Sequence, residues 1–157
     1  MRQGCNDQIN LIMELEDIKF KHTLPIQIRF NDLDVFSHVN NAIIQEYFDL
    51  GRLYYLQKVL EGELKTGKYT LIIASIKTDF MEPIFLEDSI VVKTSVFQIG
   101  NKSLQMTQQL YDMFTDTVKA ECKSVMVAFD KTNQESMELP VWWKENIIAF
   151  EDKVIVE

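Results

Sequence analysis

The spacing of apolar residues becomes regular early in the chain. Over 24–30, Ile26, Ile28 and Phe30 alternate with polar residues. Side chains that alternate in this way point to opposite faces of a strand, so one apolar face is buried and the other is solvated. The pattern therefore predicts a half-buried β-strand over these residues.

The period then changes from two to between three and four. The apolar positions that share this spacing are Val39, Ile43, Ile44, Tyr47, Phe48, Gly51, Tyr54 and Tyr55. Together they form one broad apolar face of a helix over 39–60. Asn40 or Asn41 can cap its start. Gly62 can end it, because glycine tolerates the left-handed conformation at a helix C-terminus.

Most of the remaining chain predicts strands, over 69–82, 88–99, 103–114 and 118–129. The dipeptide 100–101 is Gly-Asn, a hairpin turn signal, and 115–116 supplies a second turn. The apolar phase shifts at 110–111, which predicts a β-bulge. The segment 140–150 predicts a short helix with proline at its first position.

Long strands joined by short turns indicate an antiparallel sheet. The broad apolar face of the helix must be buried against another layer, and the sheet is the only large partner. The sequence therefore predicts an α+β fold, in which a curved antiparallel sheet of about five to six strands wraps around one long central helix. We interpret 24–157 as a single domain and 1–23 as a variable N-terminal lead-in.

Composition narrows the function. The chain has 24 acidic and 16 basic residues among 157, a net charge of −8, which disfavours nucleic acid and anionic membrane surfaces as partners. Two cysteines are too few for a disulfide framework. No apolar run approaches the ~20 residues of a membrane span, and the start has no signal-peptide core. We therefore expect a cytoplasmic protein without membrane insertion.

Candidate chemistry gathers between the predicted strand and the helix, at Asp32, Asp34, His38, Asn40 and Asn41. A helix start has unpaired N–H groups and a positive dipole end, which can polarise a carbonyl. A nearby carboxylate can then act as a nucleophile or direct a water. The competing interpretation is structural: Asp and Asn form turns and caps, Asp32 braces the loop, and His38 is a hydrogen-bonded structural histidine.

An ordered set of residues in this region resembles the signature of hotdog-fold acyl-CoA thioesterases. The set is Asp32, Asp34, His38, Val39, Asn40 and Asn41, followed by Tyr47, Phe48 and Arg52. The closest group is the 4-hydroxybenzoyl-CoA thioesterase-like branch. The segments 78–92, 100–112 and 129–140 are similar to the family in the same order, so the resemblance covers roughly 24–140.

The resemblance implies a single hotdog fold and hydrolysis of an acyl-CoA thioester, or of an acyl carrier protein thioester, without a metal or other cofactor. It implies that Asp34 is the catalytic residue. His38, Val39, Asn40 and Asn41 are then the substrate-binding residues, and backbone N–H groups near Asn41 polarise the thioester carbonyl. It also implies a homodimer or homotetramer with the site between subunits.

Two positions depart from the family pattern, and two other functions stay open. Ser37 stands where the family usually has glycine, and Ile44 stands where it often has an aromatic residue. The first alternative is a non-catalytic module that binds acyl thioesters. The second is an acyl-thioester dehydratase, whose histidine–aspartate pair is usually arranged differently from this loop.

Several predicted strands carry apolar residues on both faces, which predicts apolar surface for a subunit contact. The residues concerned are Val91 with Val92, Val96 with Phe97, and Val125 and Val127 with Met126. We expect Met106, Met113 and Met126 to lie in the core. Trp142 and Trp143 are expected to cover an end of the sheet or to join a subunit contact.

Overall fold

The computed structural model describes residues 18–61, 64 and 67–157, which adopt a mixed α+β fold. Predictions for Gly62 and for most of the lead-in lie outside the described residues. In chain order the elements are β1 (His22–Pro25), the 3-10 helix η1 (Phe30–Asp32), α2 (Asn41–Val59), β2 (Tyr69–Phe80), β3 (Ile90–Ile99), β4 (Ser103–Asp112), β5 (Thr117–Asp130), β6 (Glu135–Ser136), α4 (Val141–Phe150) and β7 (Ile155–Val156).

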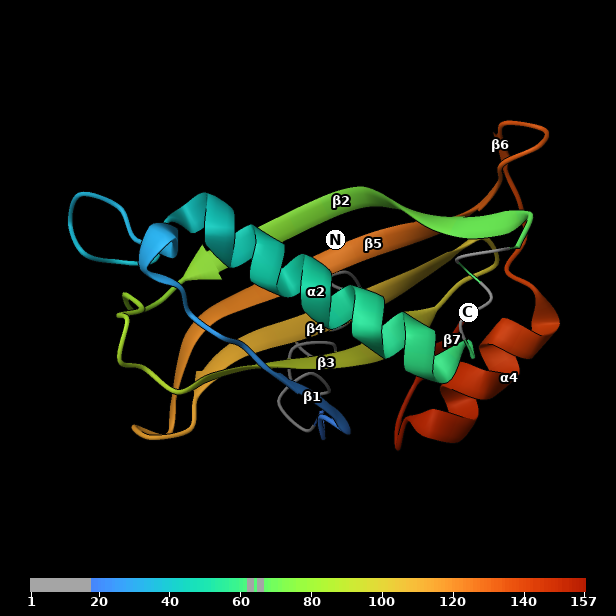
Figure 1. Ribbon diagram of the computed structural model, residues 1–157. Coiled ribbons are helices and arrows are strands. Elements are labelled where there is room, and N and C mark those ends of the chain that lie inside the picture. Colours follow the sequence, from blue (N-terminus) through green and yellow to red (C-terminus); the bar gives the residue numbers. More distant parts are fainter. Residues whose placement is uncertain (1–17, 62–63, 65–66) are drawn as a thin grey trace, which may run out of the picture.

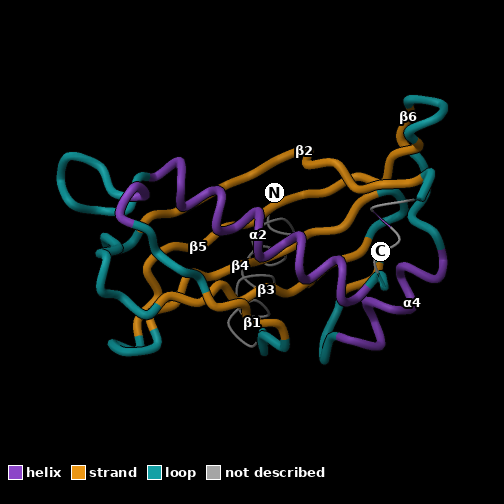
Figure 2. The backbone as a smooth tube through the Cα atoms, in the orientation of Figure 1, coloured by secondary structure: helices purple, strands orange, loops and turns teal. Residues whose placement is uncertain are grey.

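The strands form one curved sheet whose order is β1-β3-β4-β5-β2. Neighbours along this path are antiparallel, while the two-residue strands β6 and β7 pair with β5 and β3. Helix α2 crosses one face of the sheet, and α4 lies beside its C-terminal end (Figures 1 and 2). The predicted fold, a long helix wrapped by an antiparallel sheet, is confirmed.

Two apolar clusters lie between α2 and the sheet. The cluster under the first half of the helix includes Ile44, Phe48 and Val92. The cluster under the second half includes Tyr55, and Trp143 from α4 closes it at the end of the sheet. The first of the two roles expected for the tryptophan pair, covering an end of the sheet, is therefore observed for Trp143.

A polar network lies between these clusters. The buried guanidinium of Arg52 donates to Gln108 Oε1 at 2.7 Å. The Gln108 amide in turn donates to Phe48 O at 2.9 Å and Thr94 Oγ1 at 3.1 Å. Because each buried polar group has a partner, the network is tolerated and fixes the helix along the sheet.

The strand predicted over 24–30 is only partly correct. Strand β1 ends at Pro25, although the Ile26 N–H still donates to Ile90 O at 2.9 Å. Ile26 and Ile28 do pack against the core, but Phe30 begins η1 and is 79% exposed. The chain leaves the sheet early because it must turn Asp32 toward α2, a requirement described below.

Other local predictions hold to within a few residues. The β4–β5 ladder shifts register between Leu110 and Tyr111, so the predicted bulge is confirmed. Pro140 is the N-cap of α4 and not its first helical residue. The prediction that Met113 lies in the core is wrong, because the turn after β4 leaves its side chain 58% exposed. Tyr54 is also exposed, on the solvent side of α2.

A buried carboxylate ties the end of α4 to the sheet and to α2. Glu151 Oε1 accepts from Tyr55 Oη at 2.7 Å and from Val96 N at 3.0 Å. Burial raises the pKa of Glu151 despite these hydrogen bonds. Its ionisation therefore opposes folding at neutral pH: the stability linked to this group is fully present below the ordinary pKa of 4.5 and declines as pH rises through the raised value.

We expect Glu151→Gln to become more stable relative to wild type as the pH rises. The amide oxygen can still accept from Tyr55 and Val96, and it carries no charge to desolvate. Melting temperatures of both proteins at pH 4 and pH 8 check this, since contributions from other carboxylates cancel in the difference. If the melting temperature of the variant fell relative to wild type between pH 4 and pH 8, the buried charge would be net stabilising.

Candidate active site

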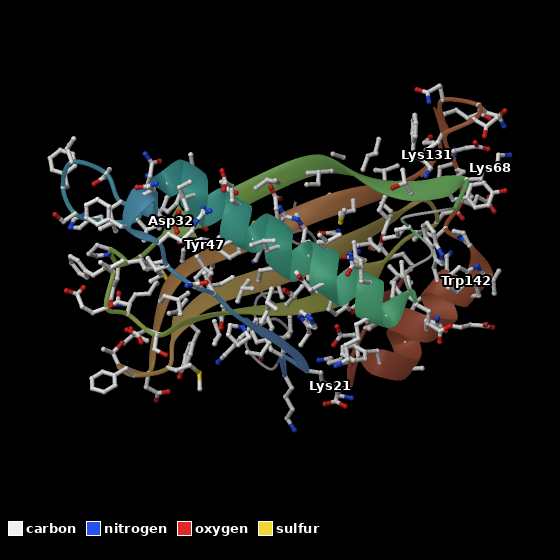
Figure 3. All side chains as sticks on the ribbon, viewed as in Figure 1. Lys21, Asp32, Tyr47, Lys68, Lys131 and Trp142 are labelled. Atoms are coloured by element: carbon white, nitrogen blue, oxygen red, sulfur yellow. The ribbon has the colours of Figure 1, made fainter. Side chains whose placement is uncertain are left out.

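The carboxylate of Asp32 ties the loop before α2 to the helix. It is 1% exposed and accepts from Arg29 N at 2.8 Å, from the Arg29 guanidinium at 2.8 and 3.0 Å, and from Tyr47 Oη at 2.6 Å. Figure 3 shows Asp32 and Tyr47 side by side near the start of α2. All of these donors come from the chain itself, so the group is fully occupied.

Hydrogen bonding decides the charge of Asp32. Burial alone would raise the pKa of this carboxyl, but the hydrogen bonds from Tyr47 and Arg29 outweigh burial and lower it. Burial and the same contact with Asp32 raise the pKa of Tyr47. Asp32 therefore stays ionised and braces the loop, as its structural interpretation predicted, and its stabilisation is lost only as the pH falls through its lowered pKa.

Asp34 lies two residues further on, in a tight turn. Its Oδ1 accepts from Phe36 N at 2.8 Å and from His38 N at 3.4 Å, and its N–H donates to His38 O at 2.8 Å. The side chain is half-buried, and its Oδ2 accepts no hydrogen bond from any described residue. One oxygen thus shapes the turn while the other remains available to a bound molecule.

Ser37 occupies the strained position of this turn. Its φ is 61°, in the left-handed region that L-residues other than glycine disfavour. The family preference for glycine at this position therefore has a conformational reason. The left-handed backbone conformation costs free energy for serine that it would not cost for glycine.

We expect Ser37→Gly to stabilise the fold by about 0.5–1 kcal/mol, the left-handed strain relieved less the extra chain entropy of glycine. Urea unfolding measures this difference. Ser37→Ala is the matched control, because it removes the hydroxyl and keeps the strain, so it should give no such gain. Equal stabilisation by both substitutions would mean that the hydroxyl, and not the backbone, is responsible.

The first turn of α2 leaves few backbone donors free. Val39 N donates to Ile84 O, Asn40 N donates to Asp32 O, and Ala42 N donates to Asn40 Oδ1, at 2.8 to 2.9 Å. Asn40 is therefore the N-cap, as one of the two predicted caps. In the described part of the chain, the Asn41 N–H has no acceptor, and it lies at the positive end of the helix dipole.

A cavity of about 280 Å³ opens beside these groups. Four of the five predicted site residues line it: Asp34, His38, Val39 and Asn41. The fifth, Asn40, is not among the lining residues and caps the helix. Ile44, the second departure from the family pattern, forms part of the wall.

The opposite wall was not predicted from the sequence. It consists of the residues that end β2 and begin the β2–β3 loop: Phe80, Met81, Glu82, Pro83 and Ile84. The Phe85 ring packs edge-on against His38, with ring centroids 5.0 Å apart. The two loops lie at the same end of the sheet (Figure 1). Of these residues, only Pro83 could be singled out from the sequence, because proline indicates the end of a strand.

A larger cavity, of about 750 Å³, lies between β1 and α2. Its walls are mostly apolar, with Leu24, Ile26 and Leu53 among them, and Arg29 and Tyr47 also line it. Asp34 does not. Among the described residues, no cluster of three metal-ligating side chains is present. None of the described helices is long and apolar enough to cross a membrane.

Comparison with known families places the chain. The sequence profile described as the thioesterase-like superfamily matches residues 28–147. This is more than half of the chain and includes both loops of the cavity. The protein therefore belongs to the thioesterase-like superfamily, and its fold is the hotdog fold. No curated protein matches the chain.

Solved structures of similar fold include three that are informative. A thioesterase from Thermus thermophilus, complexed with coenzyme A and zinc, is 28% identical, with a TM-score of 0.74 over 83% of this chain and 99% of that one. A protein of Pseudomonas aeruginosa is 22% identical, with a TM-score of 0.77 over 85% of this chain and 94% of that one. A 1,4-dihydroxy-2-naphthoyl-CoA thioesterase from Synechocystis is 16% identical, with a TM-score of 0.70 over 80% of this chain and 93% of that one. At these lower identities the similarity concerns the fold.

Proposed function

We propose that the protein hydrolyses acyl-CoA thioesters, releasing a carboxylic acid and coenzyme A. The observation that carries this proposal is that two groups on one cavity, the Oδ2 of Asp34 and the N–H of Asn41, have no hydrogen-bond partner among the described residues. A thioester carbonyl needs a carboxylate to attack it or to activate water, and a donor to hold the developing oxyanion.

In this mechanism the carbonyl oxygen accepts from the Asn41 N–H. The helix dipole strengthens that donor and stabilises the negative charge that forms on the oxygen. Asp34 Oδ2 then attacks the carbonyl carbon, or it takes a proton from the water that attacks. In the first route the C–S bond breaks and the acyl group stays on Asp34 as an anhydride, which a water molecule then hydrolyses to the free acid and the aspartate. In the second route the oxygen of the attacking water enters the acid directly as the C–S bond breaks. In both routes the departing thiolate takes up a proton that the water supplies.

Of the two alternative functions, the dehydratase fits less well. In a dehydratase a histidine and an aspartate act together, whereas the His38 ring packs against Phe85 and forms no hydrogen bond with Asp34. The apolar cavity between β1 and α2 favours the remaining alternative, a binding module for acyl thioesters. A hydrolysis assay separates that function from catalysis.

We expect Asp34→Asn to lower thioester turnover by about 10²-fold or more, because the amide can neither attack nor accept the proton. The fold should persist, since the amide oxygen can still accept from Phe36 N. Release of free thiol from a panel of acyl-CoAs measures the effect, and circular dichroism checks the fold.

Asp32→Asn is the matched control. It removes the other carboxylate of the loop, and its main effect should be a lower melting temperature, because the buried contacts to Arg29 and Tyr47 weaken. Turnover at a temperature well below melting should fall less than in Asp34→Asn. If Asp34→Asn kept near wild-type turnover, Asp34 would not be the catalytic residue.

We propose that the active unit is a cytoplasmic homodimer or homotetramer that joins through β2. In the described sheet β2 pairs only with β5, so its other edge has unpaired N–H and C=O groups. Ile73, Ile76 and Phe80 on this strand are 42–47% exposed. An antiparallel second copy would pair the edge and cover these side chains. Phe80 also lines the Asp34 cavity, so the partner would complete its wall.

Light scattering should give at least twice the 18.4 kDa of the chain at micromolar concentration. Ile76→Lys, which places a charge on the exposed edge strand, should shift the protein toward the monomer and reduce its turnover. Lys77→Met on the same strand is a control that removes a charge without adding one. A wild-type protein that is monomeric and fully active would contradict the assembly.

A further inference from the structure

The β-bulge in strand β5 points to a residue that the mechanism has not used. Across the β4–β5 ladder, Leu110 pairs with Ala120 and Tyr111 pairs with Val118, so Lys119 faces no residue on β4. Bulges re-aim a side chain and occur often next to active sites. Lys119 stands where β5 meets the loop that walls the Asp34 cavity.

The backbone of Lys119 holds the start of that loop. Its carbonyl oxygen accepts from both Met81 N, at 2.9 Å, and Glu82 N, at 3.0 Å. Both donors belong to residues that line the cavity. Met81 is the next position opposite Lys119 in the β2–β5 register, after Phe80 and Ala120, and Glu82 N is a second donor to the same carbonyl.

The side chain of Lys119 holds the same loop at both ends. The residue is 7% exposed, which is rare for lysine unless it is paired. Its Nζ lies 3.1 Å from Glu82 Oε2 and 3.9 Å from Asp88 Oδ2, and 4.0 Å from Asp112 Oδ2 on β4. Asp112 and Asp88 are 1% and 16% exposed, while Glu82 is half-exposed, so removal of the ammonium would leave two largely buried carboxylates without this cation.

The segment between the two loop carboxylates contacts the catalytic loop directly. Ile84 O accepts from Val39 N at 2.8 Å, and the Phe85 ring packs on His38. Asp88 Oδ2, in the lysine cluster, also accepts from Phe85 N at 2.9 Å. A displacement at Glu82 or Asp88 would therefore reach Val39 and His38 through one short segment.

We propose that Lys119 is a positioning residue of this active site, which acts through Glu82 and Asp88 to hold the 82–88 segment against the loop of Asp34. It does not touch the substrate. The inference deepens the proposed hydrolysis, because misplacement of a wall by ~1 Å can reduce a rate about 10²-fold. It also predicts a structural signature that exists without any substrate.

The first test reads that signature by NMR. The chain has only two histidines, so the ring signals of His38 and His22 can be assigned by substitution. In Lys119→Met the His38 ring signals should shift, because the edge-on contact with Phe85 changes, while the His22 signals stay in place. Lys21→Met is the matched control: it removes an ion-paired lysine (Asp152, 2.6 Å) and should leave the His38 signals unchanged.

The second test is kinetic. Lys119→Met should lower kcat about ten- to a hundredfold with a smaller change in KM, and Lys119→Arg, which keeps the charge, should recover most of the loss. Lys21→Met should keep wild-type kcat. A general loss of stability would not produce this split when kcat is measured well below the melting temperature.

Unchanged His38 signals together with unchanged kcat in folded Lys119→Met would overturn the inference. If that variant does not fold, Glu82→Gln replaces it: this change weakens the ion pair, and it should shift the His38 signals in a folded protein. No shift there would also overturn the inference. If wild type hydrolyses no thioester, the proposed function fails, while the NMR test of Lys119 still stands.

Discussion

The buried charge of Asp32 constrains the chain around the candidate active site. A carboxylate that is withdrawn from water must be surrounded by donors, and here these come from Arg29 before η1 and from Tyr47 in α2. The backbone oxygen of Asp32 also accepts from Asn40 N. Both ends of the intervening loop are therefore fixed. Asp34 lies within that closed loop, so its geometry follows from contacts that it does not make.

Two carboxylates one residue apart thus have different roles because their surroundings differ. Asp32 has every oxygen lone pair directed at a donor of the chain, so it stays charged and inert. Asp34 uses only one oxygen, on Phe36 and His38. The surroundings of each side chain, and not the residue type, therefore give Asp32 a structural role and make Asp34 the candidate catalytic residue.

The sequence predicted those features whose signals are local. The period of α2, the Asn40 cap and the register shift beside Leu110 all depend on neighbouring residues, and all are observed. The early end of β1 depends on satisfying Asp32 from α2, which no local pattern reveals. The wall at 80–84 and the cluster around Lys119 also bring distant segments together, so the sequence alone could not show them. The expected second apolar face is only partly observed: Val91 and Phe97 are buried, Val125 and Val127 are half-buried, and most side chains of β2 are exposed.

The glycine in the middle of α2 links the evolution of the helix to that of the sheet. A Cβ on Gly51 would lie 2.8 Å from both γ-carbons of Val92 and 2.8 Å from Gln108 Nε2. Such distances are shorter than any van der Waals contact, so the helix here rests on the strands with no room for a methyl group. A relative with a larger residue at this position must therefore carry a smaller one on β3 or β4, or hold its helix further from the sheet. Substitutions at these sites should covary across the superfamily.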